Sequence, residues 1–175
     1  MEKETKYDIV IFGATGFTGD LTAKYLAKRM KDEPFRLGIA GRDEIKLAAL
    51  KKELIAINPI CSEVGIIHAD VNNYASLLKM TNETKLVITT VGPYLKYGEP
   101  VVKACVEGRA DYLDLTGEGG FVNQVTNFYQ RKAVENKVKI LNCCGFDSIP
   151  ADLGTYFTVK QLPSNEPIEV ECFVS

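Results

Sequence analysis

The chain has 175 residues, of which 46% are hydrophobic and 25% charged, and its formal net charge is −2. These values are typical of a globular domain, and the scattered Lys and Arg residues form no basic stripe that would neutralise a nucleic-acid backbone. No apolar run approaches the ~20 residues of a membrane span, the charged start is unlike a signal peptide, and the five cysteines include no Cys-x-x-Cys pair. We therefore expect an intracellular protein with no nucleic-acid partner and no metal site.

An apolar run followed by three evenly spaced glycines lies near the start of the chain. Residues 7–12 predict a strand, and Gly13, Gly16 and Gly19 follow in the pattern G-x-x-G-x-x-G. The first glycine suits a tight turn, the second lets backbone approach a pyrophosphate, and the third lets the helix pack closely on the strand. Free N–H groups and the helix dipole would then favour phosphate. The predicted dinucleotide-binding turn consists of Gly13, Ala14, Thr15, Gly16, Phe17, Thr18 and Gly19.

Apolar periodicity predicts an alternation of helices and strands after this turn. Leu21, Tyr25, Leu26 and Met30 recur at helical spacing and predict the first crossover helix. Further strands are expected at 35–41, 64–67, 85–91, 112–115 and 138–144, with helices around 45–54, 75–80, 101–106 and 121–136. Six strands separated by helices predict a doubly wound parallel Rossmann sheet of order 3-2-1-4-5-6, an α/β domain spanning residues 1–150.

The end of the chain, residues 151–175, follows a different pattern. A helix is expected from Pro150 to about Leu162, and the alternating stretch 168–174 predicts a strand. A lone strand after a completed Rossmann sheet has no obvious partner in the same domain. We therefore expect residues 151–175 to lead into a second domain that continues beyond Ser175 and holds the substrate half of the protein.

The end of the second predicted strand distinguishes NAD from NADP. NAD-preferring domains usually place Asp or Glu there, whereas this chain has Gly41 and Arg42. A guanidinium can hold a 2′-phosphate with two hydrogen bonds, and Lys46 adds a second positive charge one helical turn later. NADP is therefore the predicted cofactor, and NAD is less favoured. In the alternative, Arg42 only caps the strand end and Asp43 binds the ribose, although Asp43 is better suited to cap the following helix.

Two further strand ends are expected to line the cofactor. Asp70 and Val71 follow the third strand, where the adenine ring normally lies, but Asp70 could equally cap the next turn. After the fourth strand, Gly92 would let backbone approach the ribose or nicotinamide, and Tyr94 either closes over the cofactor or substrate or is a buried loop anchor. This second turn consists of Val91, Gly92, Pro93 and Tyr94.

Polar side chains follow the fifth and sixth predicted strands. They are Asp114, Thr116, Glu118, Asp147 and Ser148. Hydride transfer needs a proton donor for the developing anion, and two neighbouring carboxylates can be forced apart in pKa so that one stays protonated. We therefore take Glu118 or Asp147 as the candidate catalytic acid. In the alternative, Asp147 or Ser148 caps a helix whose first residue is Pro150.

Tyr156 and Lys160 match the Tyr-x-x-x-Lys pair of short-chain dehydrogenases. The pair follows the sixth strand, which is too late for the helix that carries it in those enzymes, so we interpret it as a chance match. Leu153, Tyr156 and Phe157 instead predict an apolar helix face.

Six segments of the chain together carry a family resemblance. They are residues 13–19, 40–42, 91–94, 97–102, 114–118 and 145–154. With these motifs the chain resembles the saccharopine dehydrogenase-like oxidoreductases, a group related to trans-acting enoyl reductases, and the last segment is the most specific. The resemblance implies the N-terminal portion of a longer protein: an NADP-binding Rossmann domain followed by a substrate or dimerisation domain. It also implies, for animal members, association with lipid droplets or membranes.

These observations predict an NADP-dependent oxidoreductase domain. Its expected reaction is hydride transfer to or from an unidentified carbonyl or enoyl substrate of small-molecule or lipid-like character. The expected partners beyond the substrate are a lipid-droplet or membrane surface and a second copy of the longer protein. Two alternatives stay open: a non-catalytic NADP-binding sensor or scaffold, and an epimerase-like short-chain dehydrogenase that depends on Tyr156.

Overall fold

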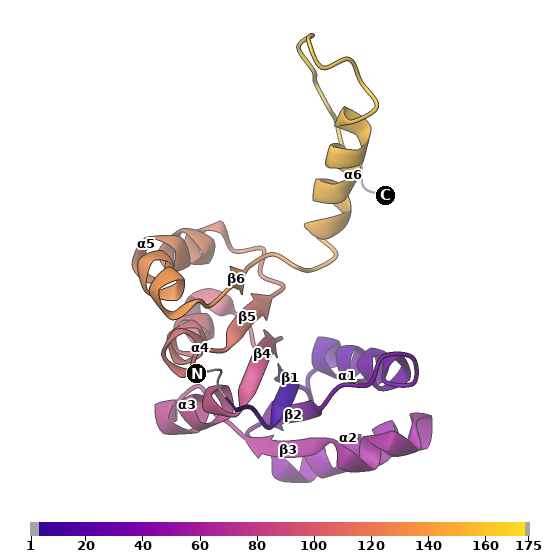
Figure 1. The fold of residues 1–175 in the computed structure, drawn as a ribbon, viewed down its shortest axis with the longest axis vertical. Helices are drawn as coiled ribbons and strands as arrows, with labels where there is room; N and C mark the ends of the chain where they lie inside the picture. Colours follow the sequence, from indigo (N-terminus) through magenta and orange to yellow (C-terminus); the bar gives the residue numbers. More distant parts are fainter. Residues whose placement is uncertain (1–3, 174–175) are drawn as a thin grey trace.

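A computed structural model describes residues 4–173 and confirms the predicted doubly wound sheet (Figure 1). Six parallel strands lie in the order β3-β2-β1-β4-β5-β6. Their bounds are β1 (Tyr7–Phe12), β2 (Leu37–Gly41), β3 (Gly65–His68), β4 (Thr84–Thr89), β5 (Asp111–Asp114) and β6 (Ile140–Leu141). The order reverses between β1 and β4, and open parallel sheets bind ligands at such a point, outside the carboxyl ends of the strands.

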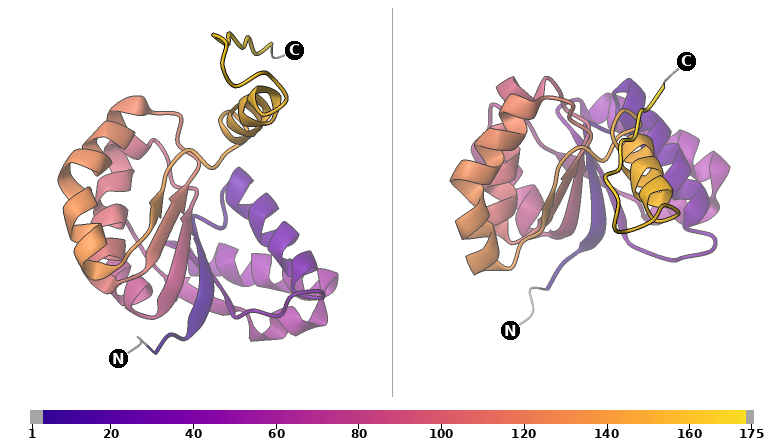
Figure 2. Two further views of the ribbon diagram at one scale, coloured as in Figure 1. Left: turned by 45° about the horizontal axis from the view of Figure 1, so that its top comes forward. Right: turned by 90° about the horizontal axis from the view of Figure 1, so that it is seen from above.

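Helices cover both faces of the sheet (Figure 2). On one face lie α1 (Phe17–Arg29) and α2 (Glu44–Ile57), followed by the short 3₁₀ helix η1 (Pro59–Glu63). On the other lie α3 (Tyr74–Asn82), α4 (Tyr94–Gly108) and α5 (Gly119–Asn136). Because side chains alternate along a strand, Val10 belongs to the core beneath α3–α5 and Ile11 to the core beneath α1 and α2. Among residues 4–173, no helix has the length and apolar character needed to cross a membrane.

The buried face of α1 differs from the prediction. The spacing of large apolar residues favoured Leu21 and Tyr25, yet these side chains are 53% and 62% exposed. The buried residues of the helix are Gly19, Ala23 and Ala27. The reason is the close approach of α1 to the preceding turn, since a Cβ added at Gly19 would lie 2.2 Å from the carbonyl oxygen of Gly13. Small side chains therefore fill the part of the interface next to the turn, while Leu26 and Met30, the other two predicted residues, pack against the core as expected.

Helix α4 and strand β6 differ clearly in length from the predicted elements, and β4 ends at Thr89 and not at residue 91. Helix α4 begins at Tyr94, well before the predicted start, and accommodates Pro100 within it. Strand β6 ends at Leu141 and not at residue 144, because Cys143 adopts the left-handed conformation with φ 62°. That turn directs the backbone N–H groups of Cys143 and Cys144 toward Asp114 and ends the strand.

The C-terminal segment stands away from the sheet (Figure 1). Helix α6 (Ile149–Val159) ends before the predicted Leu162, and none of its residues is buried. The strand predicted at 168–174 is wrong for residues 168–173, which have no regular structure; Val174 lies outside the described residues. An alternating sequence can form a strand only beside another strand, and the described residues offer this segment no such partner.

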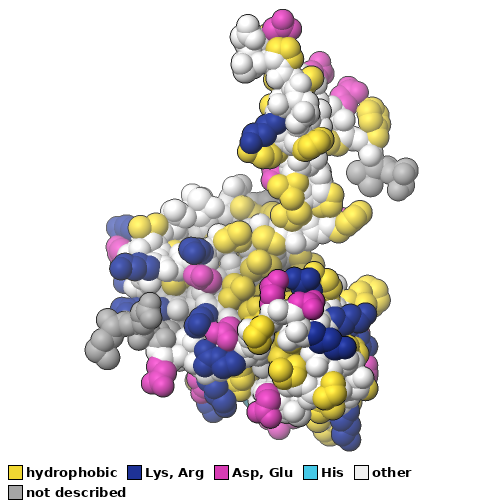
Figure 3. Space-filling view, turned by 45° about the vertical axis from the view of Figure 1, so that its right-hand side comes forward, with side chains coloured by type: hydrophobic (Ala, Val, Ile, Leu, Met, Phe, Trp, Pro, Cys, Tyr) yellow, Lys and Arg dark blue, Asp and Glu magenta, His cyan; other side chains and the backbone are white. Residues whose placement is uncertain are grey.

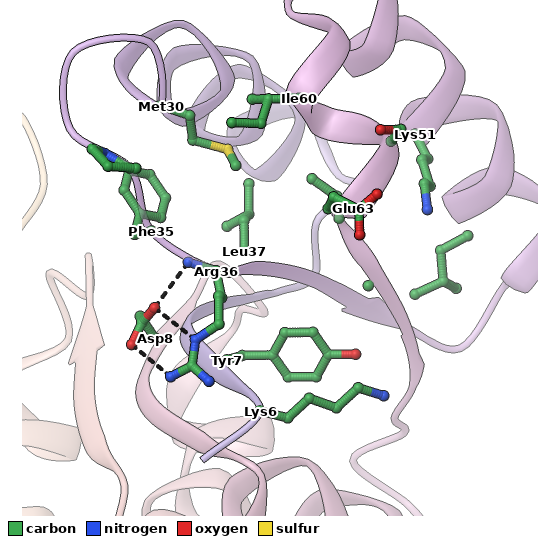
Figure 4. A pocket seen from close by; sticks show the side chains of 15 residues that line it. Lys6, Tyr7, Asp8, Met30, Phe35, Arg36, Leu37, Lys51, Ile60 and Glu63 are labelled. Carbon is green, nitrogen blue, oxygen red and sulfur yellow. Dashed lines mark hydrogen bonds and ion pairs between the residues drawn. The ribbon is translucent and has the colours of Figure 1, made fainter.

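The amino edge of the sheet is joined by an ion-pair cluster around Asp8 (Figure 4). The Asp8 carboxylate accepts hydrogen bonds from Arg36 Nε at 3.1 Å, Arg36 Nη2 at 3.0 Å and the Arg36 backbone N–H at 2.9 Å. Lys85 Nζ lies 2.8 Å from the same carboxylate. The cluster therefore links the starts of β1, β2 and β4. The hydrogen bonds of Arg36, followed by that of Lys85, hold the pKa of Asp8 well below its usual range.

Replacing Asp8 with Asn should destabilise the fold in a pH-dependent way. A carboxyl group with a lowered pKa contributes full stability above its unfolded-state pKa of about 3.9 and loses that contribution as the pH falls through the folded-state value. At pH 7 we expect D8N to lower the free energy of unfolding by about 2 kcal/mol, and the difference from wild type to shrink below about pH 4.

Urea denaturation of wild type and D8N at pH 7 and at pH 3 measures the loss of unfolding free energy and its dependence on pH. The matched control is E33Q, which removes an exposed ion pair with Arg29 on α1 and should change stability by under about 0.5 kcal/mol. If D8N is less stable than wild type by the same free energy of unfolding at both pH values, the assigned role of Asp8 is contradicted.

Candidate cofactor site

The glycine turn after β1 has the geometry that the spacing predicts. Gly13 has φ +87°, and a Cβ there would lie 2.7 Å from the Val91 side chain, so the position requires glycine on both grounds. Its N–H donates to the Ala40 carbonyl of β2 at 2.9 Å. Gly16 precedes α1 as its N-cap, and no side chain caps the first turn of this helix. The N–H groups of that turn are thus open to an anion, at the positive end of the helix dipole.

A cavity of about 320 Å³ lies beside this turn at the carboxyl ends of β1, β2, β3 and β4. The structure brings together eight predicted residues around it: Gly13, Thr15, Gly16, Arg42, Asp70, Val71, Val91 and Gly92. The cavity therefore lies at the point where the strand order reverses, and backbone from the turns after β1 and β4 faces it from two sides.

Seven predicted cofactor residues do not line the cavity: Ala14, Phe17, Thr18, Gly19, Lys46, Pro93 and Tyr94. Ala14 and Gly19 are buried behind the turn, whereas Phe17 is 85% exposed outside it. Lys46 is exposed, with Nζ 3.8 Å from a carboxylate oxygen of Asp43. The first four belong to the glycine turn and α1, Lys46 belongs to α2, and Pro93 and Tyr94 form the start of α4.

The buried side chain of Tyr94 anchors the loop after β4, as the second of the two alternatives predicts. Its hydroxyl donates to the Thr89 carbonyl at 3.1 Å, and its ring lies 5.8 Å from that of Phe121. Burial raises the pKa of Tyr94 to about 12. The neutral side chain therefore joins β4, α4 and α5 and does not close over the cavity.

Arg42 and Asp43 divide their roles at the end of β2. Asp43 caps α2 by accepting the Lys46 N–H at 3.0 Å, which confirms the helix-cap interpretation. Arg42 is exposed and lines the cavity. The guanidinium is thus the charged group that β2 presents to a ligand, and the neighbouring carboxylate is directed into the helix.

Asp70 has a turn-capping role and also lines the cavity. Its Oδ1 accepts the Asn72 backbone N–H at 2.9 Å and the Asn72 side-chain amide at 3.2 Å. The turn-capping alternative thus describes its carboxylate in this structure, while an adenine contact stays a prediction.

Six residues that line the cavity are outside the predicted set: Phe12, Gly41, Ala69, Asn72, Thr90 and Tyr97. The Thr90 hydroxyl lies 3.2 Å from the Gly13 carbonyl and 3.3 Å from that of Phe12, so it joins the glycine turn to the end of β4. Its position near the end of the fourth predicted strand, beside the predicted turn, was a usable signal; in the structure β4 ends at Thr89. Tyr97 could not be found this way, because α4 begins earlier than the periodicity indicated.

The two catalytic candidates lie in different environments. Both carboxylate oxygens of Glu118 accept backbone N–H groups at the start of α4, from Tyr94 at 2.7 Å and from Leu95 at 2.9 Å. Asp147 is exposed in the turn before α6. Ser148 is the N-cap residue of α6, as the helix-cap alternative predicts, but no side chain accepts a hydrogen bond there, and Pro150 is the second residue of the helix and not the first. A proton-donating role of either carboxylate stays a prediction.

The short-chain dehydrogenase pair lies on the projecting helix. Lys160 Nζ is 4.7 Å from the centre of the Tyr156 ring, and neither residue lines the cavity. The geometry therefore gives this pair no access to the candidate site within the described residues.

A larger cavity of about 770 Å³ lies at the opposite, amino edge of the sheet (Figure 4). Tyr7, Arg36 and Lys51 are among its lining residues, and Figure 4 shows Arg36 directed at Asp8. Ligands of open parallel sheets bind at the carboxyl ends of the strands. The smaller cavity is therefore the candidate cofactor site.

Comparison with known proteins shows the family of this chain. Residues 9–141 match the family model of the saccharopine dehydrogenase NADP-binding domain. The chain belongs to this family. It is an NADP-binding domain of an oxidoreductase family, and the matched residues span β1 to β6.

Similar proteins extend well beyond this domain. A trans-acting enoyl reductase of Mycobacterium ulcerans is 39% identical over 158 residues, covering 90% of this chain and 37% of that protein. A saccharopine dehydrogenase-like oxidoreductase of Mus musculus is 40% identical over 167 residues, covering 91% and 39%. The L-Glu-forming saccharopine dehydrogenase of Saccharomyces cerevisiae has the same fold, with a TM-score of 0.70 at 17% identity, covering 89% of this chain and 31% of that one. The NADP-binding domain thus spans well under half the length of these relatives.

Substituting Gly19 with Ala tests the close helix-to-turn contact. The added methyl would lie 2.2 Å from the Gly13 carbonyl oxygen and 2.8 Å from the Ala14 Cα, so backbone must shift. We expect G19A to lower the free energy of unfolding by about 2 kcal/mol, the usual size of an overpacking effect, and to weaken NADPH binding because the phosphate turn moves.

The matched control is G154A on α6, where a Cβ would meet nothing within 4 Å. It should leave NADPH binding unchanged and stabilise the helix by up to about 1 kcal/mol. Urea denaturation and calorimetric titration measure these effects. A G19A variant as stable as wild type would contradict the proposed packing constraint.

Proposed function

We propose that NADP binds in the cavity at the carboxyl edge, with its pyrophosphate at the glycine turn and its 2′-phosphate at Arg42. The observation that carries this proposal is that Arg42 and the turn line one cavity, while Asp43, the carboxylate next to Arg42 in the sequence, caps α2. A 2′-phosphate would therefore meet a guanidinium and no competing carboxylate at the end of β2. Backbone N–H groups at the start of α1 supply the donors for the pyrophosphate.

Replacing Arg42 with Ala should remove the preference for NADPH. We expect the Kd for NADPH to rise by roughly 30-fold, which corresponds to about 2 kcal/mol for a charge-assisted pair, while the Kd for NADH stays within about two-fold. The matched control is K46A, which removes a cation outside the cavity. Calorimetric titration of the three proteins with both dinucleotides measures the preference. A wild type that binds NADH as tightly as NADPH would contradict the role of Arg42.

We further propose hydride transfer to or from a carbonyl or enoyl substrate of lipid-like character. Bound NADP supplies the hydride chemistry, and the protein must supply position and a proton donor. Names of relatives that include enoyl reductases support this substrate class. Asp147 is the favoured donor, since it is exposed beside the same sheet edge, whereas both oxygens of Glu118 already accept N–H groups.

Substituting each carboxylate with its amide distinguishes the roles of Asp147 and Glu118. D147N should lower NADPH oxidation with an enoyl or carbonyl lipid by about 100-fold with unchanged NADPH affinity, because a general acid contributes to the transition state alone. E118Q should lower the melting temperature through loss of the α4 cap. Unchanged turnover in D147N would contradict the assignment. Tight NADPH binding without oxidation of any tested substrate would instead favour a cofactor sensor or scaffold.

The exposed apolar side chains support the proposal of a second domain. Figure 3 shows apolar side chains along the projecting α6 and on the domain surface next to it. Phe157 of α6 is 68% exposed, and Leu21 and Tyr25 face outward from α1. Because relatives are much longer, we propose that residues 151–175 lead into a substrate or dimerisation domain that covers these surfaces. Contact with a second copy, or with a lipid-droplet or membrane surface, would then involve that part.

A further inference from the structure

We propose that Asp114 is a positioning residue for the nicotinamide half of the site, an inference that rests on the NADP binding proposed above. Asp114 ends β5 and is fully buried. Its Oδ1 accepts the Thr116 N–H at 3.1 Å and the Cys143 N–H at 3.0 Å. Its Oδ2 accepts the Tyr112 hydroxyl at 2.8 Å and the Asn142 amide at 2.7 Å. A buried carboxylate is tolerated only with such donors, and all four here are neutral.

The first consequence is that the loop after β6 is held against β5. Because Cys143 is left-handed, with φ 62°, two successive N–H groups point to one residue. Cys143 donates to the Asp114 side chain and Cys144 to the Asp114 carbonyl, at 2.8 Å. Asn142 adds its side-chain amide. The connection that continues to α6, which includes the candidate acid Asp147, therefore starts from a position set by Asp114.

The second consequence reaches the loop after β4. Asp114 holds the backbone of Thr116, whose hydroxyl oxygen accepts the Glu118 N–H at 3.0 Å. Glu118 in turn binds the first N–H groups of α4 through Tyr94 and Leu95. That helix begins two residues after Gly92, which lines the cavity. One buried carboxylate thus connects the loops after β4, β5 and β6.

These three loops belong to one half of the sheet. A Rossmann sheet consists of two mononucleotide-binding halves, and the dinucleotide crosses from one to the other where the strand order reverses. Arg42 and Asp70 follow β2 and β3 and belong to the adenosine half. The loops that Asp114 orders follow β4, β5 and β6, which form the other half. Loss of Asp114 should therefore weaken contacts to the nicotinamide mononucleotide and spare those to the adenosine.

Asn142 makes a direct test possible, because it presents an amide to the Asp114 carboxylate. D114N places an amide opposite the Asn142 amide and removes the charge that the four donors face. The exchanged pair D114N/N142D returns one carboxylate and one amide to the same two positions. A role in positioning predicts partial rescue, because the exchange restores a carboxylate–amide contact between positions 114 and 142 while the other three donors still face an amide. A need for the carboxylate at position 114 itself predicts no rescue.

The experiment titrates wild type, D114N and D114N/N142D with NADPH and with 2′,5′-ADP, which contains the adenosine half and the 2′-phosphate alone. We expect D114N to raise the Kd for NADPH by about ten-fold, the effect of one lost charge-assisted hydrogen bond, with the Kd for 2′,5′-ADP within about two-fold. The exchanged pair should bring the NADPH value back to within about three-fold of wild type. D70N, in the adenosine half, should affect both probes equally.

The inference is overturned if D114N binds both probes like wild type, or if its affinity for both falls equally. It is also overturned if D114N loses affinity for NADPH alone and the exchanged pair does not restore it. A wild type that binds neither probe would instead overturn the proposed NADP site. If D114N does not fold, N142A keeps the charge and three donors. N142A should raise the Kd for NADPH by about three-fold and leave the Kd for 2′,5′-ADP unchanged. An equal rise in both Kd values would contradict the positioning role of Asp114.

Discussion

The contact between Gly19 and the Gly13 carbonyl is the constraint on which the cofactor site depends. A side chain at Gly19 would overlap backbone of the turn, so α1 can lie against β1 only with glycine at this position. This approach aims the uncapped start of α1 at the point where the strand order reverses. It also agrees with the rest of the helix, in which Ala23 and Ala27 are buried and Leu21 and Tyr25 are exposed.

The two halves of the sheet use different chemistry at the same edge. The adenosine half presents open N–H groups and one guanidinium, Arg42, which suit phosphate groups without a buried charge. The other half contains the buried carboxylate of Asp114, which attracts the backbone of neighbouring loops. Burial raises the pKa of Tyr112, the hydroxyl donor to Asp114, and the nearby carboxylate raises it further, so the phenol keeps the proton that it donates. Neutral donors thus order the loops around one charge.

The projecting α6 relates this domain to its longer relatives. A helix with no buried residue and with aromatic side chains along it gains little from folding alone. Leu21 and Tyr25 of α1 are exposed as well, since the helix buries Gly19, Ala23 and Ala27. The packing requirement of the phosphate turn therefore leaves apolar side chains exposed on α1, and these suit contact with a further part of the protein.

Local sequence determined much of this protein: the strand order, the glycine turn, the Asp43 cap and the position of Arg42 at the end of the second strand. Each depends on short-range backbone geometry or on side-chain periodicity, which a sequence expresses directly. Tertiary structure alone decided the buried face of α1, the early end of β6, the capping of α4 by Glu118 and the placement of Tyr97 at the cavity. These features depend on partners far along the chain. Periodicity shows which side chains are apolar but not how closely two backbones approach, and a carboxylate at a strand end does not reveal which N–H groups will reach it.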